Sequence, residues 1–346
     1  MTLLAAESLP ERIDDVDALD ELLSRPSQGL IDDFGRLDGD ILILGAGGKI
    51  GPGLARLAKR AAPAKKIVAV ARFSDPAIRR RLESWGIETH ACDLLERPAL
   101  EAMPLLPNVV FMAGRKFGTT GDEPATWAMN ALVPAMVAER FRDSRIVAFS
   151  TLCVYPFTSV ATSGASEDTE LAPPGEYANS CVARERMFGY FSRRFGTPGR
   201  IIRLGYAIDM RYGVLHEIAG HVRAGRPIDL TAGHVSIIWQ GDAINQILRA
   251  LTCCTRPTSP LNITAPEIVS VRALADGFGR RFGRPPVFAG READTGWVMD
   301  GSRAARLFGK PVVATARMVD WVADWVERDM PAYGKPTFYD SRDGRF

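Results

Sequence analysis

Several features that would identify a protein class by themselves are missing from this sequence. Its five cysteines are scattered, without CxxC spacing or a nearby histidine pair, which argues against a zinc site or a disulfide framework. The 43 Lys and Arg nearly balance the 41 Asp and Glu, so no overall charge attracts nucleic acid or an acidic membrane. No run approaches the roughly 20 apolar residues of a membrane span, and the acidic start does not resemble a secretory signal. We therefore expect a cytoplasmic protein with a small-molecule partner and no metal, nucleic-acid or membrane partner.

The composition is that of an ordinary globular protein, with 46% hydrophobic and 24% charged residues. At roughly 150 residues per domain, the 346 residues allow one large domain or two modest ones. Residues 1–38 precede the first repeated pattern and form an N-terminal extension, with short helices expected at 15–23 and through Phe34. The extension can pack on the body of the protein or on a partner subunit, and we expect a homodimer.

Short apolar runs alternate with helical patterns from residue 40 onward. Six runs suit strands buried on both faces, at 41–45, 66–71, 87–92, 109–113, 145–150 and 200–205. Helical patterns lie between them at 51–60, 76–85, 123–141 and 176–195. This alternation predicts an α/β fold with a Rossmann-like, doubly wound parallel sheet over residues 39–205, with later returns to it near 232–266.

The later part of the chain has a more mixed pattern. Helices are expected at 213–224, 242–251 and 270–282, an extended segment at 235–239, and a C-terminal helix with Trp321 and Trp325 on one face. We expect a smaller C-terminal substrate-binding lobe built from residues 206–231 and 267–335, followed by a tail at 336–346.

A glycine-rich turn follows the first predicted strand directly. Its sequence is Gly45-Ala46-Gly47-Gly48-Lys49-Ile50-Gly51. Glycines at the first, fourth and seventh positions let a pyrophosphate approach the backbone, and the amino end of the next helix supplies N–H groups and a partial positive charge. The strand, turn and helix together predict a dinucleotide site formed by Gly45, Gly47, Gly48, Lys49, Ile50 and Gly51.

Further landmarks follow in a fixed order. They are Asp93 and Leu94 after the third strand, Phe111-Met112-Ala113-Gly114 after the fourth, Asn130 in the next helix, Ser150-Thr151 and Val154-Tyr155 after the fifth, and Tyr177 at a helix start. Together with the glycine spacing, this order resembles the extended short-chain dehydrogenase/reductase superfamily, in its NAD-dependent epimerase/dehydratase group. The resemblance covers about residues 40–330. It implies that Asp93 binds the adenine and that Leu94, Ala113 and Gly114 also line the cofactor site.

The resemblance also implies a catalytic set. Tyr177 would exchange a proton with the substrate, Thr151 would orient the same oxygen, and Asn130 would complete the set. The family normally has a lysine four residues after the tyrosine, but here that residue is Cys181. A phenol with a pKa near 10 is a poor base at neutral pH, because about three pKa units cost roughly 4 kcal/mol. Three explanations are open: another cation substitutes, the chemistry needs no strong base, or the protein binds the nucleotide without catalysis.

Two residues are candidates for a substitute cation. Arg184 lies almost two helical turns after Tyr177 and on the same helix face, so its side chain can lean back toward Cys181. Lys116 follows the fourth strand, at the carboxyl edge where open α/β sheets bind ligands. We predict that Lys116 is the catalytic cation, and Arg184 is kept as a candidate substrate-side residue.

The end of the second predicted strand bears on the choice of cofactor. An acidic residue there would favour NAD, but the sequence places Arg72 at this position, where it can bind a 2′-phosphate. Asp75 precedes Pro76 and is expected to cap the next helix instead. The sequence favours NADP, with NAD as the alternative.

The substrate side is less clearly marked. Tyr212 and His216 lie where the family's substrate loop enters its helix, and Trp239 and Arg184 complete the candidates. Leu152 and Cys153 stand where the family's 4,6-dehydratases have an Asp-Glu pair, which argues against that chemistry. We expect an NAD(P)-dependent oxidoreductase or epimerase acting on a hydroxyl or carbonyl carbon of a sugar, sugar acid or nucleotide sugar. The alternative is a non-catalytic NAD(P)-binding regulator of the same fold.

Overall fold

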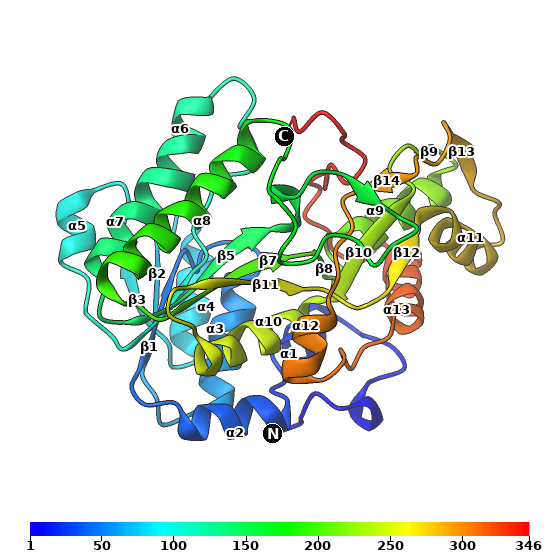
Figure 1. Cartoon of the computed structure of the whole chain (residues 1–346). Coiled ribbons are helices and arrows are strands. Elements are labelled where there is room, and N and C mark those ends of the chain that lie inside the picture. The colour runs from blue at the N-terminus through cyan, green and yellow to red at the C-terminus, as the bar shows by residue number, and fades with distance from the viewer. Residues whose placement is uncertain (346) are drawn as a thin grey trace.

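A computed structural model describes residues 1–345, which are arranged around a central seven-stranded sheet (Figure 1). All six strand pairs are parallel, in the order β11-β7-β5-β4-β1-β2-β3. The strands are β1 Ile41–Leu44, β2 Ile67–Ala71, β3 Glu88–Ala91, β4 Asn108–Phe111, β5 Arg145–Thr151, β7 Gly199–Leu204 and β11 Ser259–Ile263. The predicted doubly wound parallel sheet is therefore confirmed.

Helices cover both faces of this sheet because its central strands are apolar on both sides. Every residue of β1 and β4 is buried, and Ile43 pairs with Ala69 on one side and Val110 on the other. One face packs on α2 Gln28–Arg36, α3 Gly51–Ala61, α4 Pro76–Ser84, α10 Gln240–Arg249 and α12 Ser302–Phe308. The other packs on α5 Arg97–Glu101, α7 Val133–Arg140 and α8 Glu176–Phe195.

Two details of the sheet region differ from the sequence prediction. Six strands are predicted individually, and β11 is a seventh that lies within the later return to the sheet predicted near 232–266. The helix expected over 123–141 is divided into α6 Glu123–Trp127, a π-helical turn Ala128–Leu132 and α7. The π turn carries Asn130, whose side chain is fully buried.

The smaller lobe has its own core. A three-stranded sheet of β8 Tyr206–Ile208, β10 His234–Trp239 and β12 Ile268–Ser270 packs with α9 Val214–Ala224, α11 Val271–Phe282 and α13 Thr315–Glu327. Trp321 and Trp325 lie on α13, the C-terminal helix that the sequence predicts, and both side chains are buried. The short pairs β9 Pro227–Asp229 with β13 Val287–Ala289, and β6 Thr158–Ser159 with β14 Thr295–Gly296, lie beside this core.

Both ends of the chain pack on the body. In the N-terminal extension, the 3-10 turn Ala6–Ser8 precedes α1 Val16–Leu23, which buries Leu19, Leu22 and Leu23 in the core of the smaller lobe. Beyond α13, the tail runs between the α8 side and the smaller lobe (Figure 1). The remaining 3-10 turns are Leu152–Val154 and Ala250–Cys253. No helix within residues 1–345 is long and apolar enough to cross a bilayer.

Candidate active site

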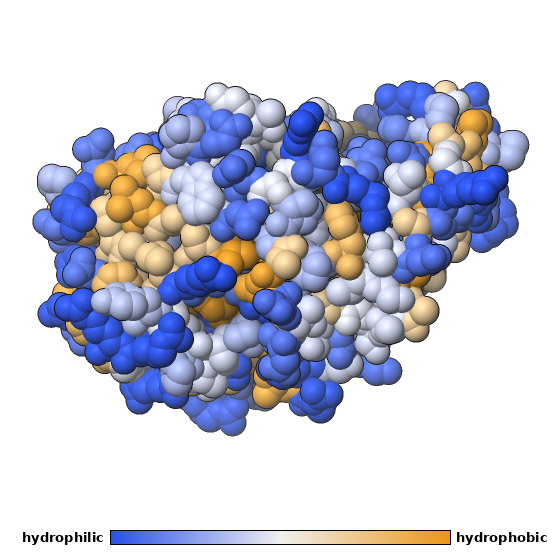
Figure 2. Space-filling view, turned by 45° about the horizontal axis from the view of Figure 1, so that its top comes forward, coloured by the Kyte–Doolittle hydropathy of each residue, from blue (hydrophilic) through white to orange (hydrophobic). Residues whose placement is uncertain are grey.

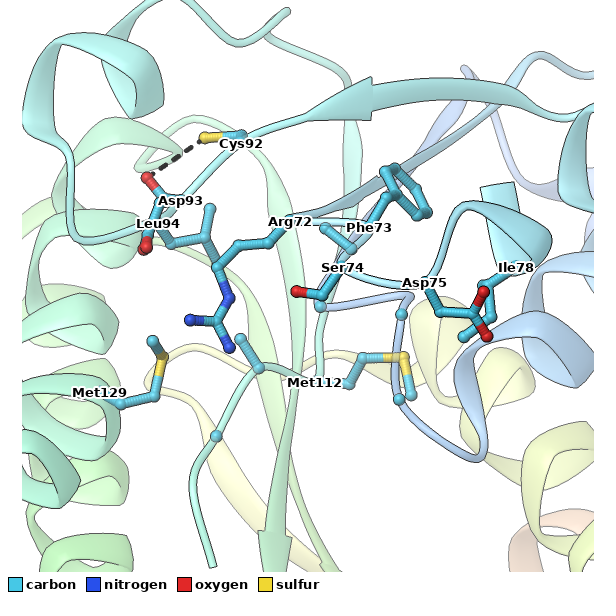
Figure 3. Close-up of a pocket in the computed structure, with 16 residues that line it drawn as sticks. Arg72, Phe73, Ser74, Asp75, Ile78, Cys92, Asp93, Leu94, Met112 and Met129 are labelled. Carbon is cyan, nitrogen blue, oxygen red and sulfur yellow. Dashed lines mark hydrogen bonds between the residues drawn. The ribbon is translucent and has the colours of Figure 1, made fainter. Parts of the chain in front are cut away.

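A first cavity, of about 400 Å³, opens where the chain leaves four neighbouring strands of the central sheet (Figure 3). Most of its lining residues come from the turns after β1, β2, β3 and β4 and from the π turn, while Ala71 ends β2 and Ile78 lies on α4. They are Gly45, Gly47, Gly48, Ala71, Arg72, Phe73, Ser74, Asp75, Ile78, Cys92, Asp93, Leu94, Met112, Ala113, Gly114 and Met129. The cavity lies at the carboxyl edge of the strands, where open α/β sheets bind ligands.

The glycine loop is tightly packed behind and open toward this cavity. A Cβ on Gly45 would lie 2.5 Å from the Ala113 nitrogen, and one on Gly51 would lie 2.2 Å from the Ala46 oxygen, so neither position accepts a side chain. A Cβ on Gly48 would meet only the Gly45 oxygen, at 3.9 Å. The open side leads into α3, whose amino end favours an anion. These residues therefore fit the pyrophosphate of a dinucleotide.

The end of β2 supplies a cation to the same cavity. The Arg72 side chain points into the cavity toward Met129 (Figure 3). Asp75 also lines the cavity, but its carboxylate accepts the Ala77 N–H at 2.9 Å and caps α4, as the sequence predicted. Phe73 between them has a φ of +50°, a backbone region that non-glycine residues rarely adopt. The turn thus carries a positive group where an NAD-selective site would carry a carboxylate.

A second cavity, of about 190 Å³, lies among segments that are far apart in the sequence. It is lined by the turns after β1 and β4, by the ends of β5 and β7 with the turns that follow them, by β8 and the loop before α9, and by parts of α8, α10 and the tail. The residues are Lys49, Ile50, Lys116, Ser150, Thr151, Leu152, Cys153, Tyr177, Leu204, Gly205, Tyr206, Ala207, Tyr212, Gly213, Gln240 and Thr337. Three of the four predicted catalytic residues, Thr151, Tyr177 and Lys116, therefore face one space.

Tyr177 and Thr151 already have local hydrogen-bond partners. The Tyr177 hydroxyl donates to the sulfur of Cys181, one helical turn further along α8. Burial raises the pKa of Tyr177 well above its usual value, Cys181 and Cys153 act in the same direction, and Arg184 opposes them. Thr151 accepts the Cys153 N–H at 3.2 Å, which leaves its own hydroxyl hydrogen for donation. In this arrangement Tyr177 is held as a neutral phenol.

Lys116 extends into the second cavity toward Tyr177. Its ammonium lies 5.8 Å from the centre of the Tyr177 ring and donates to the Thr337 carbonyl of the tail at 3.0 Å. Burial lowers the pKa of Lys116, while Cys153, Cys181 and Glu217 act to raise it. The lysine thus places its amino group beside the Tyr177 ring without being its neighbour on α8.

Asn130 and Arg184 lie behind the residues that line the site and form hydrogen bonds to the backbone there. Asn130 is fully buried, and its side chain accepts the Arg115 N–H at 2.8 Å and donates to the Arg115 carbonyl at 2.8 Å. Arg184 donates to the Asn130 carbonyl oxygen at 2.6 Å and to the Phe149 carbonyl at 3.1 Å. Neither residue lines either cavity, so Asn130 is a positioning residue for the loop that carries Lys116.

The expected substrate role of Arg184 is not supported by this geometry. Arg184 is only 6% exposed, and it lies directly beneath Gly114, where a Cβ would be 2.6 Å from its guanidinium. Trp239 is also excluded from the cavity, because it is fully buried against Trp321 in the core of the smaller lobe. His216 does not line the cavity either, whereas Tyr212 does.

Lys49 lies on the substrate side of the glycine loop. The sequence places it among the cofactor-binding residues, but its side chain lines the second cavity and not the first. Its ammonium is 3.1 Å from the centre of the Tyr212 ring and 4.8 Å from that of Phe117. Burial and the charge of Lys116 lower the pKa of Lys49 to about 7.

A buried polar network that the sequence does not signal supports the second cavity. Arg203 and Glu185 form an ion pair at 2.7 Å, and Ser150 donates to Glu185 at 2.6 Å. Arg203 also donates to the Tyr155 hydroxyl at 2.8 Å, which in turn donates to Asn262 at 2.7 Å. The network joins β5, β7, β11 and α8, and so fixes the strand end next to Thr151. Ser150 and Tyr155 belong to the landmarks of the sequence, but no local motif joins them to Asn262, which lies 107 positions beyond Tyr155.

The fold defines an α/β protein with a Rossmann-like parallel sheet. The sequence profile described as the NAD dependent epimerase/dehydratase family matches residues 41–214, and the chain belongs to that family. Among curated proteins, none matches the chain.

Solved structures share the fold over most of the chain. UDP-glucose 4-epimerase of Thermotoga maritima, solved with UDP-glucose, superposes with a TM-score of 0.68 and 14% identity, covering 84% of this chain and 99% of the other. UDP-glucuronic acid 4-epimerase of Bacillus cereus, solved with NAD, gives a TM-score of 0.67 and 18% identity over the same shares. Pal of Bacillus thuringiensis superposes with a TM-score of 0.69 and 14% identity, covering 84% of this chain and 99% of the other.

Proposed function

We propose that this protein is an NAD(P)-dependent oxidoreductase or epimerase that acts at a hydroxyl or carbonyl carbon of a sugar, sugar acid or nucleotide sugar. The observation that carries the proposal is the convergence of Thr151, Tyr177 and Lys116 on one cavity, beside a glycine loop that fits a pyrophosphate. The neighbouring structures solved with UDP-glucose and with NAD support the substrate and cofactor classes. When bound, the nicotinamide would supply hydride transfer.

The chain's own residues would handle the proton. Tyr177 would hold a proton at its hydroxyl oxygen and exchange it with the substrate oxygen, while Thr151 would orient that oxygen by a hydrogen bond. Lys116 would stabilise the tyrosinate that forms, because an opposite charge nearby favours the ionised phenol. In this role it replaces the lysine that the family has at the position of Cys181.

For the cofactor, we propose NADP in preference to NAD. Arg72 is the group in the first cavity that suits a 2′-phosphate, and the carboxylate of Asp75 is engaged at the helix cap. Calorimetric titration tests the preference: Arg72→Ala should weaken NADP binding about 10-fold to 100-fold and leave NAD binding within about twofold. A wild-type protein that binds NAD more tightly would overturn the preference.

We also propose that the protein is a homodimer. Large apolar side chains remain exposed on the π turn and α8, among them Leu132 at 51% and Tyr190 at 49%. An apolar patch is visible on the side of the molecule that carries α5 to α8 (Figure 2). Light scattering of the purified protein tests this assembly, and a monomer at micromolar concentration would contradict it.

One observation favours the alternative of a non-catalytic regulator. Cys181 occupies the position of the family lysine and accepts the Tyr177 hydroxyl, so the site as it stands holds a neutral phenol. Turnover distinguishes the two functions. The protein would be incubated with NADP or NAD and with UDP-glucose, UDP-glucuronate and the free sugars, and the products separated by chromatography. Conversion of any of them supports the enzyme, whereas tight dinucleotide binding without any conversion supports the regulator.

A further inference from the structure

Two lysines reach the second cavity from two separate loops. Lys49 belongs to the glycine loop after β1, and Lys116 belongs to the loop after β4. Like charges in a partly closed space repel each other, and after burial the charge of Lys116 is the next cause that lowers the pKa of Lys49. No carboxylate is among the residues that line this cavity in the part of the chain described.

The two carboxylates that act on these lysines are engaged by other groups. Asp209 attracts Lys49, but its two oxygens accept hydrogen bonds from Arg211 at 3.0 and 2.7 Å. Glu217 attracts Lys116, but it accepts the Thr337 N–H at 2.9 Å and the Thr337 hydroxyl at 2.6 Å. Both carboxylates therefore bind groups around the cavity and do not extend into it.

The remaining surroundings of Lys49 orient it without neutralising it. The ring of Tyr212 lies under the ammonium at 3.1 Å and that of Phe117 at 4.8 Å, and aromatic faces attract a cation. Four other polar residues of the lining carry hydroxyl or amide groups suited to sugar hydroxyls. They are Thr151, Tyr177, Tyr206 and Gln240, whereas the hydroxyls of Ser150 and Thr337 donate to Glu185 and Glu217.

We propose that Lys49 binds a carboxylate of the substrate in the second cavity, with Lys116 adding positive charge from the adjoining loop, so that the preferred substrate is an acidic sugar. This inference rests on the proposed function and narrows its substrate class. A carboxylate placed here would form a charge-assisted hydrogen bond with Lys49 and relieve the repulsion between the two ammonium groups.

Matched pairs of probes test the proposal by binding, independently of turnover. Calorimetry with saturating NADP or NAD would compare UDP-glucuronate with UDP-glucose, and D-glucuronate with D-glucose. In at least one pair the acid should bind 10-fold or more tightly than the neutral sugar. Lys49→Met should remove that preference and change the affinity for the neutral sugar and for the dinucleotide by less than threefold, while Lys49→Arg should keep most of it.

Lys335 provides the control for a general charge effect. It is an exposed lysine of the tail that also repels Lys49, so Lys335→Met should change the preference by less than twofold. A second readout uses the wild-type protein alone: UDP-glucuronate, and not UDP-glucose, should slow the acetylation of Lys49 by acetic anhydride at least threefold, as followed by mass spectrometry.

Three results would overturn the proposal: equal affinity for both members of each pair, a preference that survives in Lys49→Met, or no binding of either acid. Absence of dinucleotide binding would instead contradict the proposed function itself. If Lys49→Met fails to fold, as judged from its thermal unfolding, Lys49→Gln and the acetylation experiment decide the question.

Discussion

The two cavities differ in how the chain builds them. Every lining residue of the first cavity lies between Gly45 and Met129, and all but Ala71 of β2 and Ile78 of α4 lie in turns that directly follow strands or in the π turn. The second cavity draws on residues from Lys49 to Thr337, and most of its segments lie beyond position 130. Residues at the ends of successive strands follow one another in the sequence, so a site made from them keeps that order. A site at the meeting point of a sheet, a second lobe and a tail draws its residues from distant positions. The comparison explains why the cofactor is easier to predict than the substrate.

The largest expected effect is a loss of dinucleotide affinity caused by a substitution in the first cavity alone. Gly48→Asp should place a carboxylate beside the pyrophosphate position and weaken dinucleotide binding by about 1,000-fold, since a buried like charge costs several kcal/mol. A side chain at Gly48 meets no atom closer than 3.9 Å, so the protein should still fold. Calorimetry measures the affinity. Gly35→Asp, at a position with open space on α2, is the matched control and should bind normally.

The second expected effect concerns the network behind the second cavity. Arg203→Met leaves Glu185 as a buried, unpaired charge, and we expect a loss of about 3–5 kcal/mol in the free energy of unfolding. Urea denaturation followed by circular dichroism measures it. Arg12→Met breaks an exposed contact with Asp14 at 2.9 Å and should cost less than about 1 kcal/mol. Equal losses in the two variants would show that the network does not stabilise the site.

A third prediction separates catalysis from binding in the second cavity. Lys116→Met should lower kcat about 100-fold, because a cation that lowers the tyrosine pKa by two units contributes roughly 3 kcal/mol. Cofactor affinity should stay within about threefold, since Lys116 does not line the first cavity. Arg115→Met is the control: Arg115 pairs with Asp122 at 2.7 Å near the surface, and its loss should cost less than about threefold.

Restoring the family residue sharpens the same prediction. Cys181→Lys in the Lys116→Met background should recover part of the activity, most visibly at lower pH, where a tyrosinate depends most on a neighbouring cation. Full activity in Lys116→Met would show that no such cation is needed.

The smallest expected effect is a pH dependence confined to acidic substrates. Lys49 has a lowered pKa of about 7, so its ammonium is charged below this pH and becomes neutral as the pH rises through it. The charged groups that act on it are Lys116, Lys335 and Asp209. The KM for an acidic sugar should therefore rise above pH 7, up to about 10-fold per unit, while the KM for a neutral sugar changes little. Steady-state kinetics between pH 6 and 9 measures both, and parallel profiles would contradict the prediction.

The difference between the two cavities also explains which features of the fold and the site can be predicted from the sequence. The glycine loop, Arg72 and the helix cap at Asp75 depend on neighbouring residues, and local patterns were enough to place them. The sheet could be predicted because its strands are apolar on both faces. β11 lies within the return to the sheet predicted near 232–266, but the sequence does not mark its bounds, because Pro260 and Asn262 interrupt its apolar pattern.

The substrate side depends on contacts between distant residues. Trp239 was a plausible ligand-binding residue by position, but the smaller lobe needs its ring in the core. The sequence predicts Arg184 as a cation on the same face of α8 as Tyr177. In the structure its guanidinium lies against Gly114, beneath the loop after β4. Thr337 could not be predicted at all, since only the path of the tail brings it to Lys116.

The most direct test of the account is a crystal structure of the protein with bound oxidised cofactor and a substrate. The pyrophosphate should lie on the glycine loop, and the nicotinamide ring should enter the second cavity. The reacting carbon of the substrate should come within about 3.5 Å of the ring, with its oxygen in reach of Tyr177. The Lys116 ammonium should lie within one bridging water of Tyr177 or the nicotinamide ribose. A nicotinamide outside the second cavity, or a Lys116 turned away from both, would contradict the account.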